Sequence, residues 1–493
     1  MAGLLLFLLF SGFHQVGYIP RGRESAGRML LGDTDRNGLL EIIFVSREDF
    51  YYKVLWFYEQ EGATLFDFAV SDSMIIHNDT LDLYLWEVGD FDLDGLYDLA
   101  FYYGRWPGPT NGIAVYESPD SFSYPTQEVW RDTVGPPLVL PICVYDIDQD
   151  GLPDIVKDRA TPHGYLGIYE SIGDNQYDLI FADNPDTSGY DAPASTIAFG
   201  DFDLDGKIEF VMGGMSAGAL GATYWIYESP ADNTYERIIQ GYVSTKNIKD
   251  CFSVPDADGD GKMEFVVKGF VVPTARIHAF IFEATGDNTY EIIKSFDLFG
   301  GHNSYYGGYS EAGDVDGDGI PEIVLEACQS VFIIKSAGND SFYVWDTLPG
   351  NDGGSSIAIY DIDGNGLAEI IISGNNQTRI YEYVVGITEA TEKVIQGSGL
   401  TIYPNPFYDK TMIRSMIPDA GFVIESISLK IYDISGRVVK DLTNNLAPHT
   451  LHHTSELLWD GKDENRRQLP NGVYFVRLES PSQRITEKVV KLK

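Results

Sequence analysis

The sequence predicts an all-β protein, a seven-bladed β-propeller followed by a small β-sandwich. An acidic nine-residue loop occurs seven times, and each copy is followed by a short apolar, β-rich segment. Successive loop starts are separated by 57, 56, 55, 55, 58 and 47 residues. A period of this length with several strands per unit is typical of propeller blades. Alternating strands after residue 400 indicate a second β domain.

Each acidic loop carries oxygen-bearing side chains at positions 1, 3, 5 and 9 and a glycine at position 6. These side chains are Asp33, Asp35, Asn37 and Glu41 in loop 1; Asp90, Asp92, Asp94 and Asp98 in loop 2; Asp146, Asp148, Asp150 and Asp154 in loop 3; Asp201, Asp203, Asp205 and Glu209 in loop 4; Asp256, Asp258, Asp260 and Glu264 in loop 5; Asp314, Asp316, Asp318 and Glu322 in loop 6; and Asp361, Asp363, Asn365 and Glu369 in loop 7. Calcium takes six to eight oxygen ligands. Glycine allows the positive φ that closes such a loop. We therefore predict structural Ca²⁺ at up to seven sites.

Two other kinds of calcium-binding loop, and a charged turn that binds no metal, are the alternatives to this interpretation. EF-hand and dockerin-type loops place their last ligand at position 12 and continue into a helix. Position 12 here is Phe44, Phe101, Lys157, Met212, Val267, Leu325 or Ile372, and the following residues, such as EFVMGG (209–214), favour strands. A charged turn without an ion remains open, most of all in loops 1 and 7, where Asn37 and Asn365 replace a carboxylate.

The repeat unit is clearest around loop 4, where we predict strands at 196–200, 209–212, 223–228 and 235–239. After loop 7, only two strands can be placed before the linker. We therefore predict that the N-terminal segment 14–20 completes the seventh blade and closes the ring. The alternative, an open solenoid, would expose edge strands at both ends.

The loops resemble the FG-GAP/VCBS repeat that builds the propeller of integrin α subunits. The closest local match is AFGDFDLDG (198–206), and the resemblance covers the predicted propeller at 12–386. It implies that the calcium loops lie on one face of the propeller and that ligands bind the opposite face. Members of this family include adhesins, lectin-like proteins and a few enzymes, so the family does not name a ligand.

The opposite face would be formed by loops within blades, at 46–52, 103–112, 158–165 and 213–222, and between blades, at 182–193, 299–309 and 349–355. Their candidate ligand-binding side chains are Arg105, Trp106, His163, Tyr165, Tyr190, His302, Tyr305 and Tyr306. Aromatic rings beside polar groups can stack on sugars or grip a peptide. Packing among the loops themselves is the alternative.

Residues 387–399 are predicted to form a polar linker, and residues 400–493 a β-sandwich with Trp459 and Phe475 in its core. This domain resembles the C-terminal sorting domain of type IX secretion cargo and the immunoglobulin-like domain of the flagellar hook-cap protein. YPNPF, LKIYDISGRVV, WDGKDENRRQLPNGVYFVRLE and KVVKL carry the resemblance. It implies an immunoglobulin-like sandwich, recognition by the type IX secretion machinery, and a secreted or outer-membrane surface location. A plain structural sandwich is the alternative.

Charge and the N-terminal segment limit the class of protein further. Of the net charge of −40, residues 400–493 carry +2 (13 basic and 11 acidic side chains), so the preceding part carries −42. A protein region with this much negative charge is not expected to bind nucleic acid through its phosphates.

The apolar residues of 1–11 predict a truncated signal peptide, with a buried first strand as the alternative. No stretch is long and apolar enough to span a membrane. Cys143, Cys251 and Cys328 are predicted to be buried apolar residues rather than reactive thiols.

We expect a calcium-binding adhesion module that holds a surface glycan or an extracellular protein. The alternative is an extracellular polysaccharide lyase or hydrolase on the same scaffold. A hydrolase would need two carboxylates facing each other across a groove. Because nearly all regularly placed acids are assigned to calcium, we do not expect an enzyme, although Glu48, Asp49, Asp158 and Asp191 remain isolated candidates. A spacer without a small ligand is a third possibility.

Overall fold

The computed structural model describes most of the chain in two units. One unit spans Ser11–Val384, and the other contains the C-terminal residues from Val385 onward. The described residues are 9–22, 27–47, 53–60, 66–75, 82–104, 112–132, 139–159, 165–184, 195–214, 221–271, 276–299, 308–327, 329–351, 355–374, 377–387, 399–403, 410–417, 428–433, 437–443, 453–464, 466–480 and 483–492. Within these residues, no helix is long and apolar enough to cross a membrane.

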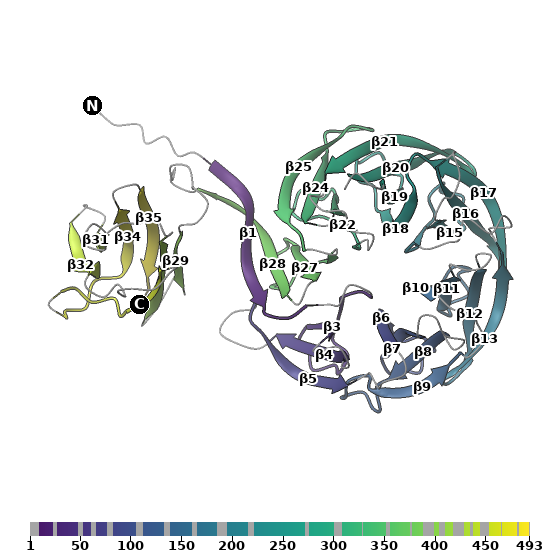
Figure 1. The fold of residues 1–493 in the computed structure, drawn as a ribbon, viewed down its shortest axis with the longest axis horizontal. Helices are drawn as coiled ribbons and strands as arrows, with labels where there is room; N and C mark the ends of the chain where they lie inside the picture. The colour runs from purple at the N-terminus through teal and green to yellow at the C-terminus, as the bar shows by residue number, and fades with distance from the viewer. Residues whose placement is uncertain are drawn as a thin grey trace. The chain divides into compact units, whose positions relative to one another are not determined.

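Among its described residues, the larger unit contains seven four-stranded sheets, which follow one another around a ring in Figure 1. We number sheets and loops together, because each acidic loop joins the first and second strands of its sheet. Sheet 1 contains β2 (Leu30–Gly32), β3 (Glu41–Arg47), β4 (Lys53–Gln60) and β5 (Phe68–Ile75). Sheet 2 contains β6 (Asp82–Gly89), β7 (Asp98–Gly104), β8 (Gly112–Glu117) and β9 (Gln127–Arg131). Sheet 3 contains β10 (Val139–Tyr145), β11 (Asp154–Arg159), β12 (Tyr165–Gly173) and β13 (Gln176–Asp183).

The remaining sheets repeat this order. Sheet 4 contains β14 (Ala198–Gly200), β15 (Glu209–Gly213), β16 (Ala222–Ala231) and β17 (Thr234–Val243). Sheet 5 contains β18 (Asn247–Val254), β19 (Glu264–Val271), β20 (Arg276–Gly286) and β21 (Thr289–Phe299). Sheet 6 contains β22 (Glu311–Gly313), β23 (Glu322–Ala327), β24 (Ser330–Ser336) and β25 (Phe342–Pro349). All four strands predicted around loop 4 are present. The third and fourth strands, β16 and β17, are longer than predicted because their ladder continues to the Ala231–Thr234 pair at the turn.

Sheet 7 closes the ring as predicted. It contains β26 (Ser356–Tyr360), β27 (Glu369–Gly374), β28 (Gln377–Ile387) and, beside β28, the N-terminal strand β1 (Leu9–Ile19). Figure 1 shows the purple β1 lying along the green β28. The Phe13 ring of β1 packs 5.4 Å from that of Trp345 and 5.2 Å from that of Tyr383, measured between centroids. The first residues of β1 lie within the range 1–11 for which a leader is predicted.

The apolar core of this unit lies between neighbouring sheets. The second strands β15, β23 and β27 are buried along their whole length, which explains why their sequences are almost continuously apolar. In the cluster between sheets 3 and 4, the rings of Phe210 and Tyr227 stack with their centroids 4.9 Å apart. Cys143 and Cys251 are buried within such clusters, as predicted. Cys328 lies outside the described residues.

The described residues of the C-terminal unit form two sheets. One contains β29 (Gly399–Tyr403), β30 (Thr411–Ile417) and β33 (His453–Trp459). The other contains β32 (Val438–Asp441), β31 (Ser428–Asp433), β34 (Gly472–Ser480) and β35 (Gln483–Lys491), in that order. Trp459 is buried in their shared core, as predicted. The core position predicted for Phe475 is wrong. Side chains alternate along β34, so that Tyr474, Val476 and Leu478 face the core and Phe475 lies on the other face.

Candidate metal centres

The seven acidic loops close in one conformation. The glycine at position 6 has a positive φ in every copy, as predicted: +88° at Gly38, +91° at Gly95, +96° at Gly151, +91° at Gly206, +95° at Gly261, +87° at Gly319 and +89° at Gly366. Position 4 is also left-handed in all seven loops, which the sequence analysis did not foresee. The sequence signal for this left-handed residue is the glycine that occupies position 4 in loops 5, 6 and 7. Two left-handed residues turn the backbone so that alternate side chains face inward.

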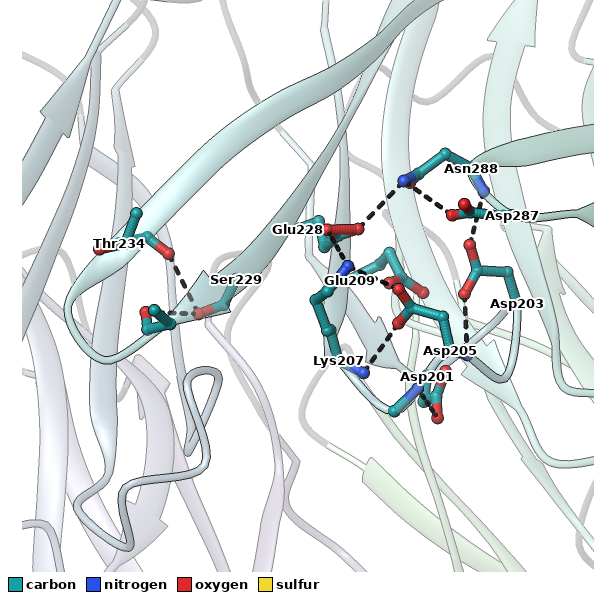
Figure 2. Close-up of polar contacts among 12 residues, drawn as sticks. Asp201, Asp203, Asp205, Lys207, Glu209, Glu228, Ser229, Thr234, Asp287 and Asn288 are labelled. Carbon is teal, nitrogen blue, oxygen red and sulfur yellow. Dashed lines mark hydrogen bonds and ion pairs between the residues drawn. The ribbon is translucent and has the colours of Figure 1, made fainter.

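Backbone amides hold the carboxylates of each loop in place, as Figure 2 shows for loop 4. Asp201 Oδ2 accepts from the Gly206 amide at 3.0 Å, and Asp203 Oδ1 from the Asp205 amide at 3.2 Å. Glu209 Oε2, on β15, accepts from the Phe202 amide at 2.8 Å. The bonds to positions 1 and 9 recur in all seven loops. In loop 4, Asp201 and Glu209 thus each use one oxygen to fix the loop and keep the other available.

Several of these second oxygens are buried without a hydrogen-bond donor among the described residues. In loops 1, 2, 4 and 5, this holds for both the first and the ninth position: Oδ1 of Asp33, Asp90, Asp98, Asp201 and Asp256, and Oε1 of Glu41, Glu209 and Glu264. A buried carboxylate oxygen without a partner is costly. An oxygen-seeking cation would satisfy both positions at once.

Loops 3 and 7 each satisfy one of these two oxygens within the described residues. In loop 3, Tyr235 donates to Asp154 Oδ1 at 2.9 Å, while Asp146 Oδ1 has no donor. In loop 7, the Asn365 amide donates to Asp361 Oδ1 at 3.0 Å, while Glu369 Oε1 has none. Carboxylate oxygens from three or four residues lie within 4.8 Å of one another in several loops, including Asp256, Asp258, Asp260 and Glu264 of loop 5. The donor set therefore fits Ca²⁺.

A fifth acidic side chain faces most loops and was missed from the sequence. It lies on the third strand, directly opposite the ninth-position carboxylate. The antiparallel registers place it at Glu59, Glu117, Glu170, Glu228, Glu283 and, opposite Glu369, Glu382. The recurring Tyr-Glu or Phe-Glu near the end of this strand was the signal. In loops 1 and 7, the fifth-position Asn37 and Asn365 donate to this glutamate. The Asn37 side-chain amide also donates to Asp35 Oδ2 and so bridges two acidic groups.

The loops also connect neighbouring sheets. The Asn288 amide, in the β20–β21 turn of sheet 5, donates to Asp203 Oδ2 of loop 4 at 2.6 Å (Figure 2). Equivalent bonds of 2.6 to 2.7 Å join Asn175 to Asp92, Asn233 to Asp148, and Asp340 to Asp258. All four donor residues have a left-handed backbone, with φ between 53° and 57°. A cation bound at the third position would therefore fix the contact between two sheets as well as the loop itself.

Burial raises the pKa of every ninth-position carboxyl group. The pKa is raised to about 7 for Glu41, Glu322 and Glu369, and to about 8 for Asp98, Asp154, Glu209 and Glu264. Desolvation is the main cause in each case, and neighbouring loop carboxylates act in the same direction. Without a cation, these groups favour the protonated form.

We expect the metal-free protein to lose stability as the pH rises from about 5 to 8. In this window the folded state holds protons that the unfolded chain has already released, since unperturbed Asp and Glu titrate near pH 4. The free energy of unfolding must then fall with rising pH. Thermal melts of metal-depleted protein at pH 5.5, 6.5 and 8.0 measure this effect. A melting temperature that stays level or rises across the series would contradict the burial of these carboxyls.

We expect Gly206→Ala to destabilise the protein by roughly 1–2 kcal/mol, the cost of placing a side chain in a left-handed backbone. A Cβ atom at Gly206 would meet nothing within 4 Å, so the effect would come from the φ of +91° alone. Gly286→Ala is the matched control, since Gly286 also has open space and its φ lies outside the left-handed range. Urea unfolding of both variants provides the measurement, and equal effects would contradict this explanation.

The eight candidate ligand-binding side chains cannot be placed. Arg105, Trp106, His163, Tyr190, His302, Tyr305 and Tyr306 lie outside the described residues. Tyr165 begins β12, but its side chain is not described. Glu48, Asp49 and Asp191 lie outside the described residues, and Asp158 lies in β11 with its side chain not described. The adhesion and catalytic interpretations both stay predictions.

A second group of charges lies away from the loops, between sheets 5 and 6. Lys268 is 2% exposed, and its Nζ lies 2.9 Å from Asp250 Oδ2 and 3.5 Å from Glu326 Oε2. It also donates to Ser310 Oγ at 2.9 Å and to the Gly308 carbonyl at 3.0 Å. Asp250 and Glu326 are themselves 1% and 0% exposed. The Lys268 ammonium thus lies between a carboxylate of sheet 5 and a carboxylate of sheet 6, and this group ties the two sheets together.

Comparison with known proteins adds two family matches. Residues 401–492 match the secretion system C-terminal sorting domain, and residues 314–372 match the FG-GAP-like repeat. The second match runs from the first residue of loop 6 into β27. Curated proteins give no match. Among solved structures, the chain is similar to PorZ, described as an essential bacterial surface component of the type-IX secretion system of Porphyromonas gingivalis, with 14% identity and a TM-score of 0.40.

The similarity to PorZ covers 93% of this chain and 58% of that chain, so the present chain spans little more than half the length of that protein. The two family matches agree with the resemblances that the sequence predicted for both regions. The chain carries an FG-GAP-like repeat within its ring of four-stranded sheets and a secretion system C-terminal sorting domain at 401–492, which indicates export to the cell surface or the medium.

Proposed function

We propose that this chain is an exported, calcium-stabilised, seven-bladed β-propeller that acts as a binding module. In this proposal the C-terminal unit is an immunoglobulin-like sandwich that directs export. Seven four-stranded sheets and the pairing of β1 with β28 support the blade count. The shared core of two sheets around Trp459 supports the sandwich. The match at 401–492 supports its sorting role.

The calcium assignment rests above all on the paired carboxylate oxygens that lack a donor among the described residues in loops 1, 2, 4 and 5. The side chains at positions 1, 3, 5 and 9 would hold the ion. Bound calcium would neutralise carboxylates that otherwise repel one another. It would also fix the bonds that connect neighbouring sheets, such as that between Asp203 and Asn288. The metal is thus structural in this proposal, and the surface away from the loops performs the binding.

A surface glycan or an extracellular protein is the proposed ligand. The test is to incubate the calcium-loaded protein with a panel of polysaccharides and matrix proteins, and to measure both retention and released sugar ends. A binding module would be supported if retention is lost in a triple variant that carries Trp106→Ala, His302→Ala and Tyr305→Ala. The melting temperature of this variant should be unchanged. Released sugar ends would favour the lyase or hydrolase instead. The absence of both retention and product would contradict the proposed ligand classes.

We expect a chain that ends at residue 399 to fold but to stay off the cell surface. The propeller has its own core clusters and closes on itself through β1, so it should keep its melting temperature. Surface labelling of cells that express the full and the shortened chains measures delivery, and a melt of the purified short chain controls for folding. Normal delivery of the shortened chain would remove the sorting role.

A further inference from the structure

Loop 6 differs from the other six loops at the residue that faces its ninth position. Ile323 on β23 pairs with Ile334 on β24, which places Lys335 opposite Glu322. The equivalent residue in each of the other six sheets is a glutamate: Glu59, Glu117, Glu170, Glu228, Glu283 and Glu382. All seven positions are described. Sheet 6 alone therefore presents a positive charge where the others present a negative one.

The Lys335 ammonium lies inside the acidic loop. Its Nζ is 2.8 Å from Asp318 Oδ2 and 2.9 Å from Glu322 Oε1, and it forms an ion pair with Asp316 Oδ2. The Lys335 side chain is 17% exposed and that of Glu322 is 0% exposed. The carboxylates of positions 3, 5 and 9 thus share one cation that belongs to the chain itself.

The oxygens that lack donors in other loops are satisfied here. Glu322 Oε1 accepts from Lys335, and Asp314 Oδ1 accepts from the Gly317 amide at 2.7 Å. Mere proximity of a lysine does not produce this arrangement. Lys207 of loop 4 contacts Asp205 and Glu228, and yet Glu209 Oε1 has no donor among the described residues.

Loop 5 repeats the arrangement of loop 4. Lys262 contacts Asp260 and Glu283 there, and Glu264 Oε1 has no donor in the described part of the chain. Lys207 and Lys262 both stand at loop position 7, at the rim, with 36% of the side chain exposed. Lys335 reaches its loop from the third strand instead, and this difference in origin accounts for the contact with the ninth position.

We propose that Lys335 is the resident cation of loop 6 and excludes calcium from it, so that the chain binds six calcium ions rather than seven. This rests on the calcium sites of the proposed function. An ammonium group and a divalent ion repel each other and cannot share the same carboxylate oxygens. Lys335 Nζ also lies 4.9 Å from the centroid of the Trp345 ring, which packs against Phe13 of the closing strand β1. The sheet next to the ring closure thus carries a cation of its own at its acidic loop.

Calcium stoichiometry, measured by equilibrium dialysis of the full chain, tests this assignment. Wild type should bind six ions. Lys335→Glu, which restores the side chain of the other sheets, should bind one more than wild type. Lys335→Gln should also bind one more, because four loop carboxylates remain. The reciprocal Glu228→Lys should bind one fewer. Lys246→Glu, an exposed site away from the loops, makes the same charge change as Lys335→Glu and should bind as wild type does.

The outcomes separate this proposal from the one on which it rests. A wild-type chain that binds no calcium would contradict the proposed function itself. Seven ions in wild type, or no gain in either Lys335 variant while wild type binds calcium, would overturn the role of Lys335 alone. Circular dichroism in calcium confirms that each variant is folded. If Lys335→Glu fails to fold, Lys335→Gln and Glu228→Lys decide the question.

Discussion

Removal of calcium is expected to lower the melting temperature and the free energy of unfolding more than any single substitution would. An independent site that is 100-fold above its dissociation constant contributes about 2.7 kcal/mol. Extracellular calcium modules have dissociation constants of about 0.1–1 mM, so about 10–100 mM calcium would reach this ratio. Several loops acting together would therefore give a stabilisation of many kcal/mol. Thermal melts in calcium and after thorough chelation measure it.

The Asp201→Asn variant measures the contribution of loop 4 alone to the calcium-dependent stability. Asp201 Oδ1 has no donor among the described residues, while Oδ2 accepts from the Gly206 amide. The asparagine can keep the amide contact but weakens cation binding. We expect the calcium-dependent stabilisation to fall by about 2.7 kcal/mol, one site's contribution. Asp178→Asn, at an exposed position of β13, is the control and should leave it unchanged. An identical melt with and without calcium would contradict the structural role of the metal.

Lys268→Met is expected to destabilise the calcium-loaded protein by about 3–5 kcal/mol, because it leaves two buried carboxylates without their cation. Asp250 would retain its bonds from Thr196 Oγ1 at 2.6 Å and the Ser310 amide at 2.8 Å. Glu326 would lose the ion pair and the Lys268 contact to its carbonyl at 3.1 Å, and would retain its bonds from the Gly308 amide at 2.9 Å and the Ser355 amide at 3.3 Å. Urea unfolding in saturating calcium measures the change. Lys246→Met, at an exposed lysine, is the control and should have little effect.

A triple variant shows whether charge is the cause. Replacing Asp250 and Glu326 by their amides in the Lys268→Met background removes both buried charges, so part of the lost stability should return. The acid-to-amide changes preserve shape, and packing alone would predict no such recovery. A loss below about 1 kcal/mol for Lys268→Met, or no recovery in the triple variant, would contradict the account of this cluster.

The spacing of acids and glycines predicts the loops because the chemistry is local. Loop closure depends on residues at most eight positions apart, and the left-handed glycines such as Gly206 appear where expected. The closure of sheet 7 by β1 was also predictable, because the sequence lacks a fourth strand after loop 7 and has a spare one at the N-terminus. The first inference rests on local spacing and the second on counting strands, and neither needs knowledge of long-range contacts.

The parts that sequence reasoning missed depend on strand register. Glu228 faces Glu209 only because β15 and β16 pair in one particular register, and the same holds for Lys335 and Glu322. A shift of one residue would have turned these side chains to the other face. Phe475 was misplaced for the same reason, since neighbouring residues on β34 alternate between the two faces. The predicted ligand-binding loops could not be compared in this way, because segments such as 300–307 lie outside the described residues.

A crystal structure of the protein grown in calcium, with anomalous diffraction to locate the ions, would test the central claim most directly. We expect anomalous peaks in loops 1 to 5 and in loop 7, each surrounded by side chains of positions 1, 3, 5 and 9. In loop 6 we expect the Lys335 ammonium instead. Loops that contain water and no calcium at saturating concentrations would contradict the proposal that calcium completes this fold.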